Sequence, residues 1–252
     1  PPRVPAAPTS VKEYTMGRRN RHVIVRSVDR APLETVDALA PIGTATVHEA
    51  IGRRGYLGAD LRPIQTGARI AGTAVTVLSH PGDNMMIHAA VEVCQEGDIL
   101  VVATTAPSTH GMFGDLLASW LQVRGVRGLV IDAGVRDTAD LREMDFPVWT
   151  RHVSCQGTVK ATPGSVNVPV TIGGITITPG DVICGDDDGV VLVDRAEADW
   201  ALERSLARLD KEEGTRARLF AGELGVDFYG LRAKLTELGV EYVDSLDQLA
   251  DD

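Results

Sequence analysis

The stretch FGDLLASWLQVRGVRGLVIDAGVRD, residues 113–137, decides the fold of this chain. Its first half carries apolar residues at helical spacing, and Gly125 ends that pattern. The run GLVID at residues 128–132 is typical of a strand buried on both faces. A similar run, DILVV at residues 98–102, precedes the helix. The pattern therefore predicts a strand, helix, strand unit of the kind that forms parallel sheet.

Upstream of this unit the pattern is regular from residue 31. We expect a helix in APLETVDALAPIG, closed by Gly43, and a second short helix in TATVHEAIG. The small and β-branched residues of GARIAGTAVTVLSH predict an extended segment, and MMIHAAVEVC predicts a helix.

Downstream, residues 166–193 contain short strand patterns separated by Gly-Gly, Pro-Gly and GDDDG turns, which predict antiparallel strands. Residues 196–219 predict a charged helix, too polar to be packed on all sides. We assign residues 1–30 to a flexible N-terminal arm, residues 31–195 to one α/β domain, and residues 196–252 to a helical C-terminal extension.

Composition restricts the class of protein. The 252 residues are 44% hydrophobic and 24% charged, as in an ordinary globular protein. A net charge of -10 argues against binding nucleic acid or an anionic membrane. The chain has no apolar run of membrane-spanning length, and PPRVPAAPTS lacks the apolar core of a signal peptide, so we expect a cytoplasmic protein. Its three widely spaced cysteines are interpreted as buried small hydrophobes, and any metal is expected to have oxygen ligands.

Gly114 and Asp115 stand directly before the predicted helix. Amides at a helix start have no partner within the helix and lie at the positive end of its dipole, so they stabilise a carboxylate or an enolate. The backbone of Asp115, Leu116 and Leu117 can therefore form an anion cradle. Taken alone, such a Gly-Asp pair is more often a capping acid.

Arg136 and Asp137 follow the GLVID strand, in the loop where open α/β sheets place their ligands. Arginine offers a planar fork for a carboxylate, and aspartate is a hard oxygen ligand for Mg²⁺ or Mn²⁺. Alone, an adjacent Arg-Asp pair is usually a solvated surface couple. However, residues 116–135 between the two pairs comprise one helix and one returning strand. Gly114-Asp115 and Arg136-Asp137 should therefore lie at the same end of the sheet.

With these motifs, the chain resembles the 4-hydroxy-4-methyl-2-oxoglutarate/4-carboxy-4-hydroxy-2-oxoadipate aldolases, class II pyruvate aldolases of the RraA-like superfamily. That superfamily also contains regulators of ribonuclease activity. Besides residues 113–137, the resemblance covers IGTATVHEA, PGDNMMIH, QGTVKATPGSVNVPV, PGDVICGDDDGVV and ELGVDFYGLR. It implies a swivelling ββα domain with a mixed sheet core, assembled as a homotrimer or a homohexamer.

The resemblance also implies roles for individual residues. Arg136 would contact the pyruvate-moiety carboxylate, Asp137 would ligate a divalent metal, Mg²⁺ or Mn²⁺, and Asp115 would organise metal-bound water. Gly114 and the amides near Leu116 and Leu117 would bind the carboxylate, and Asn84 matches a further polar position of the family's site. A glutamate on the late helix of an adjacent subunit would complete the site. Helix register leaves Glu212 and Glu213 open for that role, with Glu212 preferred.

The implied reaction is the retro-aldol cleavage of a 4-hydroxy-2-oxo acid to pyruvate, as in the aromatic catabolism of protocatechuate and gallate. Oxaloacetate decarboxylation would be a side activity, because it passes through the same enolate. An imine mechanism would need a buried lysine, and Lys160 is the one candidate, with a structural or substrate-charge role preferred. The alternatives are a non-catalytic ribonuclease regulator of the same fold and a lyase for a different oxo acid.

Other features are assigned structural roles. His48 and His88 lie in segments that resemble the family, but each is interpreted as a hydrogen-bonded structural histidine. The GDDDG run at residues 185–189 lacks the ligand spacing of an EF-hand loop and is interpreted as a tight acidic turn.

Overall fold

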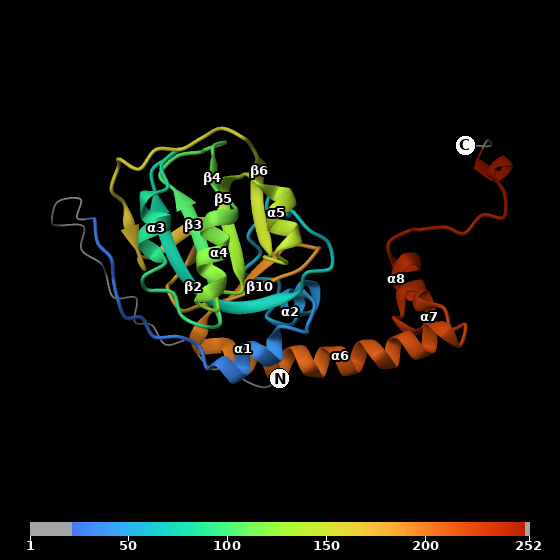
Figure 1. The fold of residues 1–252 in the computed structure, drawn as a ribbon. Coiled ribbons are helices and arrows are strands. Elements are labelled where there is room, and N and C mark those ends of the chain that lie inside the picture. The colour runs from blue at the N-terminus through green and yellow to red at the C-terminus, as the bar shows by residue number, and fades with distance from the viewer. Residues whose placement is uncertain (1–21, 250–252) are drawn as a thin grey trace, which may run out of the picture.

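The computed structural model describes residues 22–249 (Figure 1). Seven of its strands form one continuous mixed sheet in the order β1-β6-β5-β3-β2-β10-β11, with β4 beside β5 and β7 beside β2. The strands of this sheet are β1 (Arg62–Pro63), β2 (Ile70–Ser79), β3 (Asp98–Thr104), β4 (Gly111–Phe113), β5 (Gly128–Val135), β6 (Val148–Val153), β7 (Ser165–Val166), β10 (Val182–Gly185) and β11 (Val190–Val193). A separate hairpin joins β8 (Val170–Ile172) to β9 (Ile175–Ile177).

In the view of Figure 1 the helices of the body lie on one face of the sheet and along its lower edge, and the last two helices stand away from it. They are α1 (Leu33–Leu39), α2 (Thr44–Ala50), α3 (Met85–Ala90), α4 (Asp115–Val123), α5 (Thr138–Glu143), α6 (Ala198–Phe220), α7 (Gly225–Phe228) and α8 (Leu231–Glu237), with 3₁₀ turns at Arg195–Glu197 and Leu246–Leu249. Among residues 22–249, no helix is both long enough and apolar enough to cross a membrane.

The predicted strand, helix, strand unit is confirmed as β3, α4 and β5. β3 pairs in parallel with both β2 and β5, and β5 pairs in parallel with β6. β5 is buried on both faces, as a parallel central strand should be: Ile131 packs toward α3, α4 and α5, whereas Val130 packs with Trp149 on the opposite face. The short β4 comes between β3 and α4, so α4 starts at the sheet edge where β5 ends.

The predicted antiparallel region is also confirmed, since β10 pairs antiparallel with β2 and β11. The GDDDG run is the turn between β10 and β11. Its Asp186 is buried, and its carboxylate accepts hydrogen bonds from the amide (2.8 Å) and the hydroxyl (2.6 Å) of Thr44. Asp186 therefore holds the start of α2 against the sheet.

Two details differ from the expectations. Gly43 does not close α1, which ends at Leu39; it is the extended residue that precedes α2. Cys94 and Cys184 are buried, but Cys155 is exposed because it lies in the irregular segment that follows β6. Burial raises the pKa of the two buried thiols to about 12.

Residues 23–25, near the end of the predicted N-terminal arm, pair with β7. The amide of Val25 donates to the carbonyl of Val166 at 3.1 Å, and the guanidinium of Arg30 holds the buried carboxylate of Asp98 through two hydrogen bonds of 2.8 and 2.9 Å. The rest of that predicted arm, residues 1–21, lies outside the described residues.

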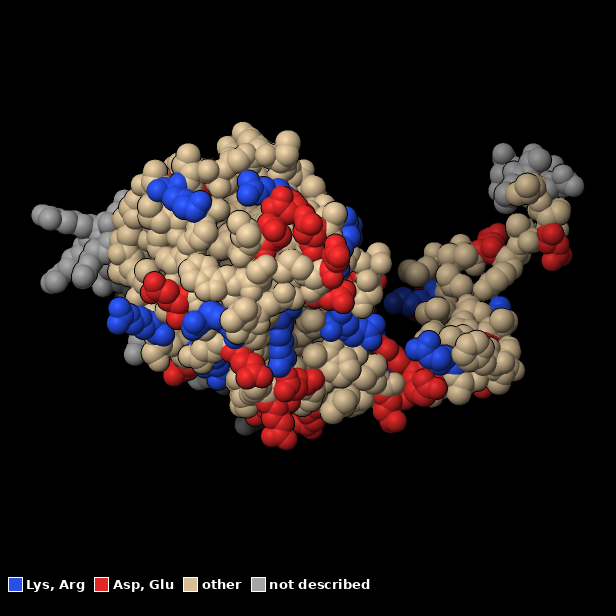
Figure 2. Space-filling model, in the orientation of Figure 1, with Lys and Arg blue, Asp and Glu red and all other residues tan. Residues whose placement is uncertain are grey.

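The predicted late charged helix is α6. Its first turns are packed on the body, where Ala198 and Ala201 join the cluster that α1 and α2 form with β10 and β11. The remainder of α6 leaves the body and carries α7 and α8 outward (Figure 1). In Figure 2 this C-terminal arm stands clear of the domain.

Candidate active site

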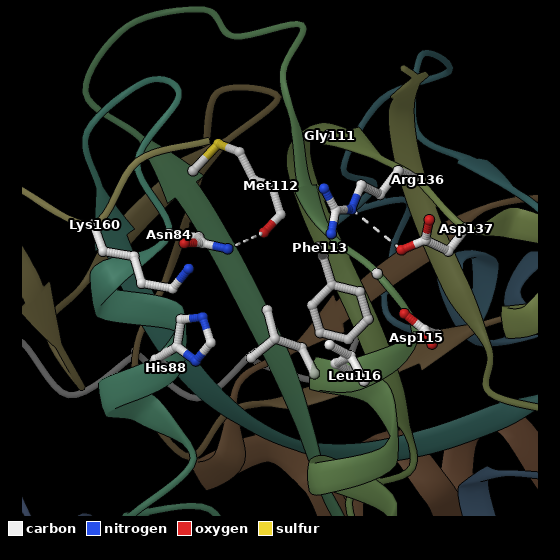
Figure 3. A pocket seen from close by; sticks show the side chains of 12 residues that line it. Asn84, His88, Gly111, Met112, Phe113, Asp115, Leu116, Arg136, Asp137 and Lys160 are labelled. Atoms are coloured by element: carbon white, nitrogen blue, oxygen red, sulfur yellow. Dashed lines mark hydrogen bonds and ion pairs between the residues drawn. The ribbon is translucent and has the colours of Figure 1, made fainter. Parts of the chain in front are cut away.

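A pocket opens where β4 and β5 end and α3 and α4 begin (Figure 3). It is lined by Asn84, His88, Gly111, Met112, Phe113, Gly114, Asp115, Leu116, Leu117, Arg136, Asp137 and Lys160. Its cavity volume is about 100 Å³, which is below the usual range of small-molecule pockets. All the predicted site residues except Glu212 therefore lie in one pocket.

Gly114 and Asp115 form one side of this pocket. Gly114 is the extended residue before α4, and the helix begins at Asp115. By helix geometry the amides of Asp115, Leu116 and Leu117 have no partner within α4 and point toward the pocket side of the helix start. Gly114 is the N-cap residue and no side chain caps α4, so Asp115 is an acid of the first helical turn that makes no capping hydrogen bond. Within residues 22–249 its carboxylate makes no hydrogen bond or ion pair.

Arg136 and Asp137 lie beside them, immediately after β5. The Nε of Arg136 donates to Oδ2 of Asp137 at 3.2 Å, and both side chains are partly exposed to solvent. Asp137 has a left-handed backbone, with φ 54° and ψ 38°. Aspartate adopts this conformation more readily than most residues, and such conformations are concentrated at functional sites. The bent backbone turns the carboxylate back toward Gly114 and Asp115.

Asn84, His88 and Lys160 form the opposite end of the pocket (Figure 3). The Nδ2 of Asn84 donates to the carbonyl of Met112 at 3.2 Å, but its buried Oδ1 has no hydrogen-bond partner in the described chain. Burial lowers the pKa of His88, and the nearby charge of Lys160 lowers it further. The ring of His88 makes no hydrogen bond to any residue within 22–249, so its interpretation as a hydrogen-bonded structural side chain is wrong.

Asp83 holds this end of the pocket together. Its buried carboxylate accepts hydrogen bonds from the amides of Met85 (2.9 Å), Ala161 (2.7 Å) and Thr162 (2.6 Å). The segment that carries Lys160 is thereby fixed to the start of α3. Burial alone would raise the pKa of Asp83, but these amide hydrogen bonds outweigh it and lower the pKa below its ordinary value.

Glu212 is not brought to the pocket within one chain. It lies on the part of α6 that leaves the body, where its Oε1 forms an ion pair with Nε of Arg208 at 2.8 Å. Its neighbour Glu213 pairs with Arg216 at 3.5 Å and is more exposed. Neither glutamate lines the pocket of its own chain.

The carboxylates of Asp115 and Asp137 are the metal-binding groups that the pocket offers. Within residues 22–249 no group of three or more His, Cys, Asp or Glu side chains is arranged to hold an ion. Two carboxylates are nevertheless a donor set that suits Mg²⁺ or Mn²⁺, which commonly complete their coordination with water and substrate oxygens. A softer metal such as zinc, which prefers nitrogen and sulfur ligands, does not fit these groups.

Lys160, expected from the sequence to have a structural or substrate-charge role, and His88, expected to be structural, both line this pocket. They come from two different segments, which are joined by the hydrogen bonds of Asp83 to Ala161 and Thr162 and by that of the Asn84 amide to the Val159 carbonyl, at 3.1 Å. Gly111 is a further pocket residue whose role the sequence pattern did not indicate. Its amide donates to the carbonyl of Gln156 at 2.9 Å, and a Cβ there would lie 2.3 Å from the carbonyl of Ser154.

The fold and the pocket define a mixed α/β domain with a helix start and two carboxylates together at one sheet edge. A family model described as RraA-like, Aldolase/RraA, matches residues 44–192. The chain therefore belongs to the RraA-like family, and the swivelling ββα fold expected from the sequence is confirmed.

Individual relatives agree with this membership. The chain is 24% identical over 202 residues to a protein of Halalkalibacterium halodurans named "Putative 4-hydroxy-4-methyl-2-oxoglutarate aldolase", a match covering 80% of this chain and 96% of the relative. A solved structure of Streptomyces coelicolor RraAS2, described as an unusual member of the RNase ES inhibitor RraA family, is 30% identical with a TM-score of 0.68. That match covers 75% of this chain and 99% of the other. An uncharacterized protein from Pseudomonas syringae shares the fold, with a TM-score of 0.67, 24% identity and coverage of 78% and 97%.

Proposed function

We propose that this protein is a divalent-metal-dependent aldolase that cleaves 4-hydroxy-2-oxo dicarboxylic acids to pyruvate. The observation that carries the proposal is the convergence of Asp115, Arg136 and Asp137 with the start of α4 in one pocket. The similarity to a relative named as an aldolase supports the same class of reaction. The substrates we propose are 4-hydroxy-4-methyl-2-oxoglutarate and 4-carboxy-4-hydroxy-2-oxoadipate, in the breakdown of aromatic acids.

Arg136 and the helix start would bind the pyruvate half of the substrate. The guanidinium of Arg136 uses Nε for Asp137, which leaves its terminal nitrogens for a carboxylate. The amides of Leu116 and Leu117, supported by the dipole of α4, provide a second set of donors. These groups keep their positions as negative charge grows on the substrate, so they stabilise the enolate more than the starting oxo acid.

The two carboxylates would have different roles. Asp137, fixed by Arg136 and by its own backbone, would hold Mg²⁺ or Mn²⁺, which when bound supplies Lewis-acid stabilisation of the enolate. Asp115 has no partner within residues 22–249, so it is free to hold a water molecule near the C4 hydroxyl and to accept a proton.

The proposed reaction cleaves the bond between C3 and C4 of the substrate. The C4 hydroxyl loses its proton to the base beside Asp115, the C3–C4 bond breaks, and its electron pair stays on C3 as the pyruvate enolate. C4 becomes a carbonyl carbon in the second product, and protonation of C3 releases pyruvate. Loss of CO₂ from oxaloacetate gives the same enolate, so we expect decarboxylation of oxaloacetate as a side activity.

We propose that Glu212 completes this site from a second copy of the chain in a homotrimer or homohexamer. Two surfaces support an assembly. The exposed face of α4 next to the pocket carries Leu116, Trp120 and Val123, and the projecting arm exposes large apolar side chains such as Phe220 and Leu224. Apolar patches of this kind mark interaction surfaces in soluble proteins.

A regulator of ribonuclease activity is the second candidate, because the chain is 30% identical to a protein described as an RraA family member. A binding protein of that kind has no need for two carboxylates beside an arginine at a helix start. The pocket therefore favours the lyase.

Pyruvate release tests the proposal. The purified protein should release pyruvate from 4-hydroxy-4-methyl-2-oxoglutarate when Mg²⁺ or Mn²⁺ is added and should lose that activity in a chelator. Asp137→Ala should be inactive. Asp145→Ala is the matched control, because Asp145 also has a left-handed backbone (φ 49°) but is exposed and distant from the pocket lining. Full activity in the chelator would refute the metal mechanism, and absence of lyase activity together with binding to a ribonuclease would favour the regulator.

A further inference from the structure

A second cavity lies at the other end of α5 from the candidate active site. α5 begins directly after Asp137, and the cavity is lined by residues of its last turn, by the segment after β1 and by the segment before β6. Its volume is about 210 Å³, larger than the cavity beside Arg136. Because it lies where β6 begins, whereas the candidate active site lies where β5 ends, the two cavities are at opposite ends of these parallel strands.

Two side chains that line this cavity have donors without an acceptor. Gln65 accepts a hydrogen bond from the amide of Val148 through Oε1, at 3.3 Å, which fixes the orientation of its side-chain amide. Its Nε2 is buried and has no partner within residues 22–249. Arg142 donates to the carbonyl of Ile64 through Nε, at 2.6 Å, and forms no ion pair in the same part of the chain. A donor without an acceptor is costly when buried, so this cavity favours a ligand that supplies acceptor oxygens.

The remaining lining restricts the charge and the shape of such a ligand. Arg142 is the cation of the lining, and the exposed Asp145 is its acid, so the cavity neutralises one negative charge and disfavours a second. Leu141, Phe146 and Pro147 provide apolar walls. A single carboxylate matches the guanidinium and the amide donor, and a short aliphatic group matches the apolar walls.

Two structural elements connect this cavity to the candidate active site. α5 has six residues, a length of about 9 Å, with Asp137 directly before its first residue and Arg142 in its last turn. The ring of Phe146 stacks on that of Phe113, with centroids 5.9 Å apart, and Phe113 lines the candidate active site. Packed side chains and short rigid helices of this kind can carry energetic coupling between two sites.

We propose that this cavity is a second ligand site, which binds a small aliphatic monocarboxylate and is coupled through α5 to Asp137. The terminal nitrogens of Arg142 and Nε2 of Gln65 donate to the carboxylate, and the aliphatic part of the ligand packs on the apolar walls. This inference goes beyond the proposed function, because the site binds its ligand whether or not the protein is an aldolase.

Propionate is the probe for direct binding. In an NMR titration of the wild-type protein at constant ionic strength, it should shift the side-chain amide signals of Gln65 until the site is saturated. Inorganic phosphate has no aliphatic part and should need a concentration about 10-fold higher or more, which is the factor expected for burying two aliphatic carbons. Arg142→Gln should weaken propionate binding by roughly 10- to 100-fold, as expected for hydrogen bonds between charged groups.

The matched control is Arg62→Gln, which removes an exposed arginine of β1 that does not line the cavity. It should leave propionate binding unchanged. Arg142→Lys, which keeps the positive charge, should retain part of the binding and provides the comparison if Arg142→Gln does not fold by circular dichroism. The site is refuted if propionate does not shift the Gln65 signals, if phosphate binds as tightly as propionate, or if neither Arg142 variant binds more weakly than Arg62→Gln.

The coupling to Asp137 is measured without turnover. Propionate should shift the backbone amide signal of Asp137 with the same concentration dependence as the Gln65 signals, and both responses should weaken together in the Arg142 variants. A response at Gln65 without one at Asp137 would refute the coupling. If propionate binds but no oxo acid is cleaved, the proposed function fails and the second site stands. If oxo acids are cleaved and propionate has no effect, the second site fails and the proposed function stands.

Discussion

A Cβ atom built on Gly114 would lie 2.1 Å from Oδ2 of Asp137. Gly114 has an extended backbone, with φ -158°, that any residue can adopt, so its lack of a side chain is required by this contact and not by its conformation. The backbone of Gly114 and the carboxylate of Asp137 are so close that no side chain fits between them. The candidate site therefore requires glycine at position 114, where the start of α4 meets Asp137.

Gly114→Ala should consequently abolish most activity while the fold persists. The added methyl group must displace Asp137, and a displacement of about 1 Å at a catalytic group can lower the rate by roughly 100-fold. We expect a loss of that size in kcat/KM for pyruvate release, with an unchanged far-UV circular dichroism spectrum. Gly157→Ala is the matched control, because a Cβ there meets nothing within 4 Å. Equal activities of the two variants would show that the contact is unimportant.

The pKa of His88 should depend on the charge of the neighbouring Lys160. Burial is the larger cause of the lowered pKa of His88, and the charge of Lys160 is the smaller. Removing a positive charge favours the protonated ring, so Lys160→Gln should raise the pKa of His88 while leaving it below the ordinary value for histidine. An NMR titration of the ring measures this change, with Lys234→Gln as control. A pKa that falls, or does not move, in Lys160→Gln would contradict the proximity of the two side chains.

Asp83→Asn should lower the free energy of unfolding by an amount that depends on pH. The folded-state pKa of Asp83 is lowered, so its ionised form contributes stability above the ordinary pKa of 3.8, and this contribution is lost as pH falls through the folded-state value. We expect Asp83→Asn to cost about 1–3 kcal/mol at neutral pH, because a buried acceptor of amide hydrogen bonds loses its charge. Urea unfolding at pH 7 and at pH 3 measures the difference, which should shrink at the lower pH.

The control for this measurement is Asp210→Asn, which changes an exposed carboxylate on α6. It should alter stability little at either pH. A difference between wild type and Asp83→Asn that grows as the pH is lowered would contradict the assigned role of Asp83.

The sequence predicted the parts of this structure that depend on local patterns. β3, α4 and β5 follow from runs of apolar residues and from Gly125, and their order places Asp115 and Arg136 at the same sheet edge. The far end of the pocket could not be predicted in this way. Lys160 is held there by hydrogen bonds that Asp83 and Asn84, more than seventy residues earlier in the chain, make to the residues next to it. Hydrogen bonds between irregular segments leave no periodic signal in a sequence.

Glu212 provides the test of whether the site is shared between chains. It lies outside the pocket of its own chain, so in a shared site Asp137→Ala and Glu212→Gln remove groups that two different copies supply. Each variant alone should be inactive. After the two are unfolded together and refolded as mixed oligomers, random assembly gives about one quarter of sites with both groups intact, and activity should return to that fraction of wild type. Glu213→Gln, which alters the more exposed neighbouring glutamate, should be active by itself. If the mixed oligomers stay inactive although each variant refolds and assembles, Glu212 does not act across subunits.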